Sequence, residues 1–124
     1  MRNKFRILFT DITISFYGKS QYESSILAGG KGTRLPEYTK SIPKPLVKIG
    51  SKPILEHIID YYIKFGFKDF LIAGGYKYTH IEKYFRNKKK SAKIRVFNTG
   101  LNSLTGKRLV KLKKELTSTF MLTY

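Results

Sequence analysis

The 124-residue sequence contains no cysteine and no tryptophan, and it has only 8 acidic residues against 25 lysines and arginines. Without cysteine the chain can form neither a disulfide framework nor a thiolate metal site. This usage is typical of a reducing compartment, so we predict a cytoplasmic location. No apolar run is long enough to cross a bilayer, and polar residues interrupt the apolar stretch near the start, so no secretory signal is expected. The length and a hydrophobic content of 41% allow one packed domain.

The shortage of acidic residues leaves a formal net charge of +17, which often marks a nucleic-acid or membrane-surface binder. The excess consists mostly of lysines scattered through every segment, and only residues 88–90 form a lysine run, beside Arg86. Scattered lysine is typical of a solvated surface, so we expect no membrane partner and place nucleic-acid binding behind other functions. A further possibility is that acidic residues of the complete fold lie outside this chain.

A glycine-rich turn is the most informative segment, within residues 26–44, which read I-L-A-G-G-K-G-T-R-L-P-E-Y-T-K-S-I-P-K. Ile26 and Leu27 predict the end of a strand that leads into the turn. The glycines that follow carry no Cβ, so backbone N–H groups can approach phosphate oxygens closely. The alternative for such a turn is an ordinary tight loop that binds nothing.

Cations follow the turn at positions 34 and 44. The Arg34 guanidinium offers a planar fork for a phosphate edge, and the Lys44 ammonium offers a compact charge. Pro43 and Pro45 flank the lysine, which predicts an extended, stiff backbone there. Together with the glycines, this pattern indicates a polyphosphate-binding segment.

Strand-like and helix-like stretches alternate from Ile26 onward, which predicts an α/β fold with a mostly parallel sheet. The predicted strands after the first span residues 69–73, 93–97 and 119–124, and the predicted helices span residues 52–65, 79–85 and 104–116. Ser51 is the expected N-cap of the first helix. Thr79 and Glu82 predict a capping box for the second.

The loops that follow the strands are expected on one side of the sheet, because parallel strands place their carboxyl ends together. They comprise the glycine-rich turn and residues 74–77 and 98–106, and we expect them to form a cleft to which Tyr76 contributes. The lysine-rich segment 86–90 is the expected exposed connector. His57 and His80 have no carboxylate cluster in the sequence around them, so packing or surface roles are expected for both.

The glycine-rich segment resembles the sugar-1-phosphate nucleotidyltransferases, whose opening motif is L-x-G-G-x-G-T-R-L followed by P-K-P. The matching residues are Leu27, Gly29, Gly30, Gly32, Thr33, Arg34, Leu35, Pro43, Lys44 and Pro45. Residues 98–109, N-T-G-L-N-S-L-T-G-K-R-L, resemble the glucose-1-phosphate cytidylyltransferase branch, in which the loop reads D-T-G-x-x-S-x-T-G-G-R-L. Asn98 and Lys107 depart from that pattern. The resemblance implies a Rossmann-like nucleotidyltransferase fold.

The resemblance also implies a reaction and a role for each site residue. The phosphate of glucose 1-phosphate would attack the α-phosphorus of CTP, and pyrophosphate would leave. Arg34 would hold the pyrophosphate and Lys44 would neutralise the α-phosphate, so these two are the predicted catalytic residues. Ser103 and Arg108 would border the nucleotide near its base and sugar. The backbone that would cradle the nucleotide is that of Leu27, Ala28, Gly29, Gly30, Lys31, Gly32 and Thr33.

Mg²⁺ is the cofactor that the resemblance implies, and its aspartate ligand in the family's G-D-G motif has no counterpart here, so no metal ligand is assigned. Residues 1–22 have no counterpart and are predicted to be an N-terminal extension. Residues 23–124 are predicted to be the nucleotide-binding part of the domain, incomplete at the C-terminal side. We therefore expect little or no transferase activity from this chain alone. Self-association into a homo-oligomer is possible through an exposed sheet edge.

Three functions remain open on the sequence. The first is an enzyme of nucleotide-sugar synthesis that serves surface polysaccharide, and the second is a catalytically inactive fragment that binds a nucleoside triphosphate. The third is a basic nucleic-acid-binding domain. Nucleotide binding that depends on Arg34 separates the first two from the third, and turnover separates the first from the second.

Overall fold

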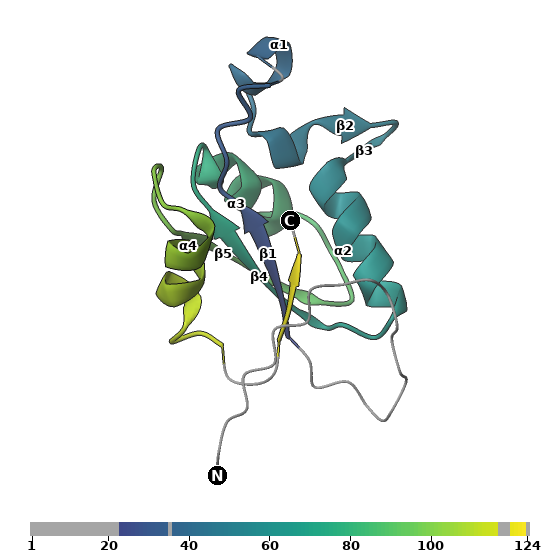
Figure 1. Cartoon of the computed structure of the whole chain (residues 1–124). Coiled ribbons are helices and arrows are strands. Elements are labelled where there is room, and N and C mark those ends of the chain that lie inside the picture. Colours follow the sequence, from purple (N-terminus) through teal and green to yellow (C-terminus); the bar gives the residue numbers. More distant parts are fainter. Residues whose placement is uncertain (1–22, 35, 117–119, 124) are drawn as a thin grey trace.

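The computed structural model describes residues 23–34, 36–116 and 120–123 (Figure 1). The predicted extension, residues 1–22, lies outside the described residues. The elements are β1 (Glu23–Ala28), α1 (Pro36–Thr39), the 3-10 turn η1 (Lys44–Leu46), β2 (Lys48–Ile49), β3 (Lys52–Pro53), α2 (Ile54–Lys64), β4 (Asp69–Gly74), α3 (Tyr78–Arg86), β5 (Lys93–Asn98), α4 (Thr105–Leu112) and β6 (Phe120–Thr123). Strands and helices alternate along the chain, as predicted.

The main sheet has four strands in the order β5-β4-β1-β6, and all of its neighbouring strands are parallel. β1 pairs with β4 from Glu23 opposite Asp69 to Ala28 opposite Gly74. On its other side β1 pairs with β6. The chain thus proceeds from β1 outward through β4 to β5 and returns to the opposite side of β1, so the strand order reverses at β1. The predicted α/β fold with a parallel sheet is confirmed.

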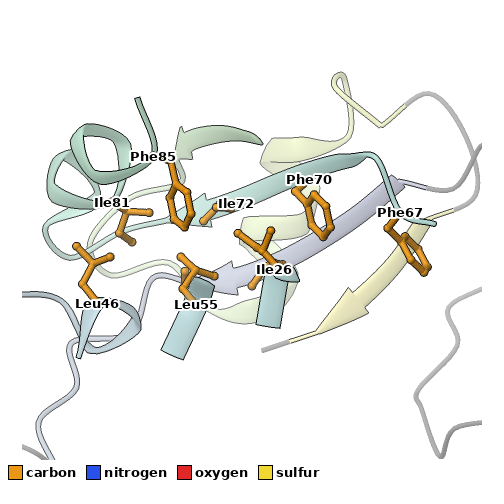
Figure 2. Close-up of a cluster of buried hydrophobic side chains, with 10 residues drawn as sticks. Ile26, Leu46, Leu55, Phe67, Phe70, Ile72, Ile81 and Phe85 are labelled. Carbon is orange, nitrogen blue, oxygen red and sulfur yellow. The ribbon is translucent and has the colours of Figure 1, made fainter. Parts of the chain in front are cut away.

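Successive side chains of a strand point to opposite faces of the sheet. Both faces of this sheet carry buried apolar side chains, and helices cover both. On one face, strand side chains pack against α2, α3 and η1 (Figure 2). The fully or nearly fully buried residues labelled there are Ile26, Leu46, Leu55, Phe67, Phe70, Ile72, Ile81 and Phe85. On the other face, Leu71 and Ala73 of β4 pack against Leu112 of α4, which lies on the opposite side of the sheet from α2 (Figure 1).

The starts of α2 and α3 differ from the sequence prediction. Lys52 and Pro53 form β3, which pairs with β2 in an antiparallel hairpin, so Ser51 is not an N-cap. Pro53 precedes α2 in an extended conformation, φ −59° and ψ 151°. α3 begins at Tyr78, so Thr79 lies inside the helix, and the predicted capping box is wrong. In both places backbone hydrogen bonds of a hairpin or turn fix the helix start, and they outweigh a side-chain cap.

Helix α4 is shorter than its apolar spacing predicted. It ends at Leu112 instead of Leu116. Leu104 precedes the helix and is 81% exposed, whereas Leu112 is buried. The other buried residue of α4 is Arg108, a cation that a pattern of apolar residues could not identify as part of the interior.

The lysine-rich connector is only partly exposed. Lys88 and Lys89 are exposed as predicted, but the Lys90 side chain is only 14% exposed. Its ammonium donates to carboxylate oxygens of Glu56 and Asp60 on α2, at 2.7 Å in each case. The Tyr84 hydroxyl of α3 also donates to Glu56. This charge network fixes the connector and α3 to α2, so the prediction of an exposed connector is wrong at Lys90.

The charge network makes stability depend on pH. Burial raises the pKa of Glu56, but hydrogen bonds from Lys90 and Tyr84 and the charges of Lys90 and Lys88 outweigh it, so the pKa lies below its ordinary value of 4.5. The pKa of Asp60 is likewise lowered, because hydrogen bonds from Lys52 and Lys90 and the charges of these lysines outweigh its burial. A carboxyl group whose folded pKa is lowered stabilises the fold above its unfolded pKa, and this stabilisation is lost as pH falls through the folded pKa.

We therefore expect Glu56→Gln to lose less thermal stability than the wild type when pH falls from neutral to about 3, because the amide does not titrate. Circular dichroism melting curves at several pH values measure this difference. The control is Glu82→Gln, which removes the same charge from an exposed ion pair, in which Glu82 lies 3.8 Å from Arg86. An equal loss of melting temperature in all three proteins would contradict the assignment of acid sensitivity to Glu56.

Candidate functional site

The loops after β1, β4 and β5 are in direct contact with one another. We call residues 29–34, which follow β1, the glycine loop. The Tyr76 N–H, in the turn after β4, donates to the Gly29 carbonyl at 3.4 Å. After β5, the Thr99 N–H and hydroxyl donate to the Gly74 carbonyl at 2.8 and 2.7 Å. The predicted convergence of these loops is confirmed, and it occurs at β1, where the strand order reverses and open α/β sheets bind ligands.

The Arg108 side chain joins the loops that follow β1 and β5. From α4, its Nη2 donates to the Gly29 carbonyl at 3.0 Å. Its Nη1 donates to the Gly100 carbonyl at 2.7 Å and to the Thr99 hydroxyl at 2.8 Å. The residue is only 6% exposed. Sequence reasoning placed Arg108 beside the nucleotide; the structure shows contacts with the loops themselves.

The Arg108 guanidinium brings a positive charge into this junction. Burial lowers the pKa of the Arg108 guanidinium. An arginine nevertheless stays protonated in proteins at neutral pH. The acceptors named above are neutral carbonyl and hydroxyl oxygens, so the charge adds to that of the exposed cations on the glycine loop. The junction is therefore suited to an anionic ligand.

Gly29 and Gly75 leave the space that Arg108 occupies. A Cβ atom on Gly29 would lie 2.2 Å from Cζ of Arg108. A Cβ atom on Gly75 would lie 2.6 Å from Nη1 of Arg108 and 2.7 Å from the Gly29 carbonyl oxygen. Such distances are far below van der Waals contact, so a Cβ atom at Gly29 would displace the Arg108 side chain, and one at Gly75 would also displace loop backbone. The sequence identified Gly29 by its motif and missed the site role of Gly75, whose contacts depend on the tertiary structure.

The far end of the glycine loop lies against α1 and Lys44. Gly32 has φ +64°, which favours glycine, and its carbonyl accepts a hydrogen bond from the Thr39 hydroxyl at 2.9 Å. A Cβ atom on Gly32 would lie 3.0 Å from Cβ of Lys44. The predicted lysine therefore lies beside the glycine loop, as the phosphate hypothesis requires.

The backbone at Lys44 differs from the prediction. Pro43 is extended, with φ −68° and ψ 148°, but Lys44 begins the 3-10 turn η1. The Leu46 N–H donates to the Pro43 carbonyl and the Val47 N–H to the Lys44 carbonyl. Proline is accepted in the first turn of a helix because the N–H that it lacks has no helical partner there. The prediction of an extended stretch was therefore wrong at Lys44.

The remaining predicted site residues differ in exposure. Leu27 and Gly32 are half-buried, Ala28 and Gly29 are buried, and Gly30, Lys31, Thr33, Arg34 and Lys44 are exposed. The two predicted catalytic cations thus carry side chains that a ligand can reach. Ser103 is half-buried, and its hydroxyl lies 3.3 Å from Nζ of Lys111, which also donates to the Thr99 carbonyl at 2.8 Å. Sequence reasoning missed Lys111, although it lies one helical turn after Arg108.

Metal ligands are not gathered at this site. Among the described residues there is no group of three or more histidine, cysteine, aspartate or glutamate residues that could hold a metal ion. Asp60 is paired with Lys52 and Lys90, and Asp69 with Arg95. Nε2 of His57 lies 2.9 Å from the Ile49 carbonyl oxygen, and His80 is exposed.

The helices within the described ranges include none that is long and apolar enough to span a bilayer.

Comparison with known proteins connects this geometry to a family. A sequence model described as Nucleotidyl transferase matches residues 24–113. A probable glucose-1-phosphate cytidylyltransferase of Bacillus subtilis is 37% identical over 80% of this chain and 48% of its own length. A glucose-1-phosphate cytidylyltransferase of Salmonella typhimurium is 58% identical over 50% of this chain and 24% of its own length.

A solved structure supports the same relationship. HddC from Yersinia pseudotuberculosis, complexed with GMP-PN, matches with a TM-score of 0.68 and 27% identity. The match covers 82% of this chain and 47% of that protein. The chain therefore spans about half the length, or less, of the relatives that it matches.

Proposed function

The chain belongs to the nucleotidyl transferase family, and we propose that it binds a nucleoside triphosphate at the glycine loop and takes part in nucleotidyl transfer to a sugar 1-phosphate. More narrowly, we propose CTP as the nucleotide and glucose 1-phosphate as the acceptor. One observation carries the proposal: the glycine loop follows β1, where the strand order reverses, and it contacts the buried Arg108 guanidinium.

The proposed chemistry needs no nucleophilic side chain. A phosphate oxygen of the sugar 1-phosphate forms a bond with the α-phosphorus of the nucleotide, and the bond from that phosphorus to pyrophosphate breaks. Backbone N–H groups of residues 27–33 would hold the nucleotide. Arg34 would bind the departing pyrophosphate with its planar fork, and Lys44 would offset charge at the α-phosphate. The rate increase would then come from positioning and charge stabilisation.

The described residues do not fit a protein site for the implied Mg²⁺. Asp69 begins β4, at the opposite end of the strand from the glycine loop, and it is held by Arg95 at 3.0 Å. Asp60 lies on α2 within the charge network. Carboxylates already paired with cations are poor ligands for a further cation. No step is therefore assigned to a metal.

The most specific part of the proposal is which base the bound nucleotide carries. CTP is supported by the two relatives that are named as cytidylyltransferases. The HddC structure, however, contains a guanine nucleotide analogue. Asn98, the last residue of β5, and Lys107, in α4, stand where the cytidylyltransferase pattern has aspartate and glycine. Binding must therefore be compared among CTP, GTP, UTP and ATP.

Calorimetry of the folded chain with each nucleotide and Mg²⁺ tests the proposal. We expect saturable binding with CTP preferred, and we expect Arg34→Ala to weaken it about tenfold, because one charge-assisted hydrogen bond is lost. The control is Arg86→Ala, since Arg86 is exposed on α3 and belongs to no part of the site. Absence of heat with all the nucleotides would contradict the proposed function.

Nucleotide binding without turnover is the second candidate function. It is favoured because Asp60 and Asp69 are ion-paired and are therefore poor ligands for the implied Mg²⁺. Pyrophosphate release from CTP and glucose 1-phosphate distinguishes it from catalysis by this chain. Nucleic-acid binding, suggested by the charge of +17, would instead show steep salt dependence that Arg34→Ala leaves unchanged.

A further inference from the structure

We propose that Tyr76 and Lys77, in the turn after β4, are positioning residues that hold the far end of the glycine loop, residues 32–34. The proposal rests on the proposed function, since it concerns the same nucleotide site. Neither side chain is assigned to the ligand. Their suggested role is to fix where the phosphate-binding groups lie.

Both side chains reach the end of α1. The Tyr76 hydroxyl donates to the Thr39 carbonyl at 2.9 Å, and the Lys77 ammonium donates to the Lys40 carbonyl. The Lys77 ammonium also lies 5.4 Å from the centroid of the Tyr76 ring. Residues 37 positions apart in the sequence are thereby joined. These contacts tie the end of α1 to the turn after β4.

Thr39 connects the end of α1 to the glycine loop. Its hydroxyl donates to the Gly32 carbonyl at 2.9 Å, and the residue is buried. A Cβ atom on Gly32 would lie 2.6 Å from Cγ2 of Thr39, so the two residues are closely packed. We call this connection the strap: it runs from Tyr76 to Thr39 and from Lys77 to the adjacent Lys40, and then from Thr39 to Gly32. Because the Tyr76 N–H also donates to the Gly29 carbonyl, Tyr76 is connected to both ends of the loop.

The backbone of Lys77 indicates that this turn is firmly held. Its φ of 50° and ψ of 36° are left-handed, and no other non-glycine residue in the described part of the chain has a positive φ. Such conformations persist where the surroundings determine them, and they are frequent at functional sites. Here the Tyr78 N–H donates to the Gly75 carbonyl and the His80 N–H to the Lys77 carbonyl, which ties the turn to the start of α3.

The strapped end of the loop lies near both predicted catalytic cations. Arg34 lies two residues after Gly32 in the sequence, and Lys44 packs beside Gly32. Release of the strap would let these cations move relative to the backbone N–H groups near Gly29, which Arg108 holds separately. We therefore expect a larger loss of affinity for the triphosphate, whose distal phosphates would contact Arg34, than for a nucleoside monophosphate, which has only the α-phosphate assigned to Lys44.

Tryptic cleavage of the full chain without nucleotide tests the strap itself. Local opening of a loop sets its cleavage rate, so we expect Tyr76→Phe to be cut after Lys31 and Arg34 about fivefold faster than the wild type. Tyr84→Phe is the matched control: it loses one hydroxyl that donates to Glu56, within the charge network. The control should be cut at the wild-type rate at these two positions. Equal rates for Tyr76→Phe and the wild type would overturn the proposal.

Nucleotide affinity tests the consequence. We expect Tyr76→Phe to bind CTP about fivefold more weakly than the wild type does, with a smaller loss for CMP, which lacks the phosphates assigned to Arg34. Lys77→Met should change binding in the same direction, and Lys77→Arg should stay closer to the wild type. An equal loss for CTP and CMP would overturn the positioning role. If the wild type binds no nucleotide while Tyr76→Phe is cleaved faster, the proposed function fails and the strap stands.

Discussion

Replacement of Arg108 by methionine is expected to lower the free energy of unfolding by roughly 3 kcal/mol and to remove detectable nucleotide binding. The guanidinium donates to the Gly29 and Gly100 carbonyls and to the Thr99 hydroxyl, and methionine can donate to none of them. Each buried acceptor left without a donor costs about 1–3 kcal/mol, and relief of the buried charge offsets part of the total. The loops after β1 and β5 would then lose their common contact.

Chemical denaturation and calorimetry of Arg108→Met measure the two effects. The control is Arg86→Met, which makes the same substitution at an exposed position of α3. Arg108→Lys should be intermediate, because it retains the charge without the planar fork. If Arg108→Met is as stable as Arg86→Met and binds CTP equally well, Arg108 does not organise the site.

Replacement of Gly75 by alanine is expected to destabilise the fold by about 1–3 kcal/mol, the range for overpacked interiors. The new Cβ atom would lie 2.6 Å from Nη1 of Arg108, 2.7 Å from the Gly29 carbonyl oxygen and 2.9 Å from the Gly100 carbonyl oxygen. Two of these atoms belong to the backbone, so the loops themselves must move. A displacement of about 1 Å of a positioning group can lower a reaction rate about a hundredfold. We expect a loss of comparable order in the affinity for CTP.

The matched control is Gly106→Ala, in which the new Cβ atom would meet nothing within 4 Å. Gly106 lies in α4, where alanine is favoured over glycine by up to about 1 kcal/mol, so this variant should be slightly more stable than the wild type. The two substitutions add the same methyl group and should change stability in opposite directions. A Gly75→Ala protein that melts at or above the wild-type temperature would contradict the described packing of the three loops.

The secondary structure could be predicted where local sequence decides it. The strand near 69–74 follows from a short apolar run and the strand near 93–98 from alternating faces, and both were found. The beginning of β1 was not, because Glu23, Ser24 and Ser25 are polar and yet buried. Their burial results from the pairing of β1 on both sides, by β4 and β6, which no local pattern contains.

The candidate site likewise has features that the sequence determines and features that only the tertiary structure determines. The sequence alone determined the chemistry proposed for it: glycines that would let backbone N–H groups approach a phosphate, and the charges of Arg34 and Lys44. These follow from residue type and spacing. Only the tertiary structure decided which groups are engaged by the protein itself, since Arg108 meets Gly29 across 79 positions and Tyr76 meets Thr39 across 37. The physical reason is that a parallel sheet brings distant loops to one edge, where close contacts between backbone and side chains leave some cations buried and others free to bind a ligand.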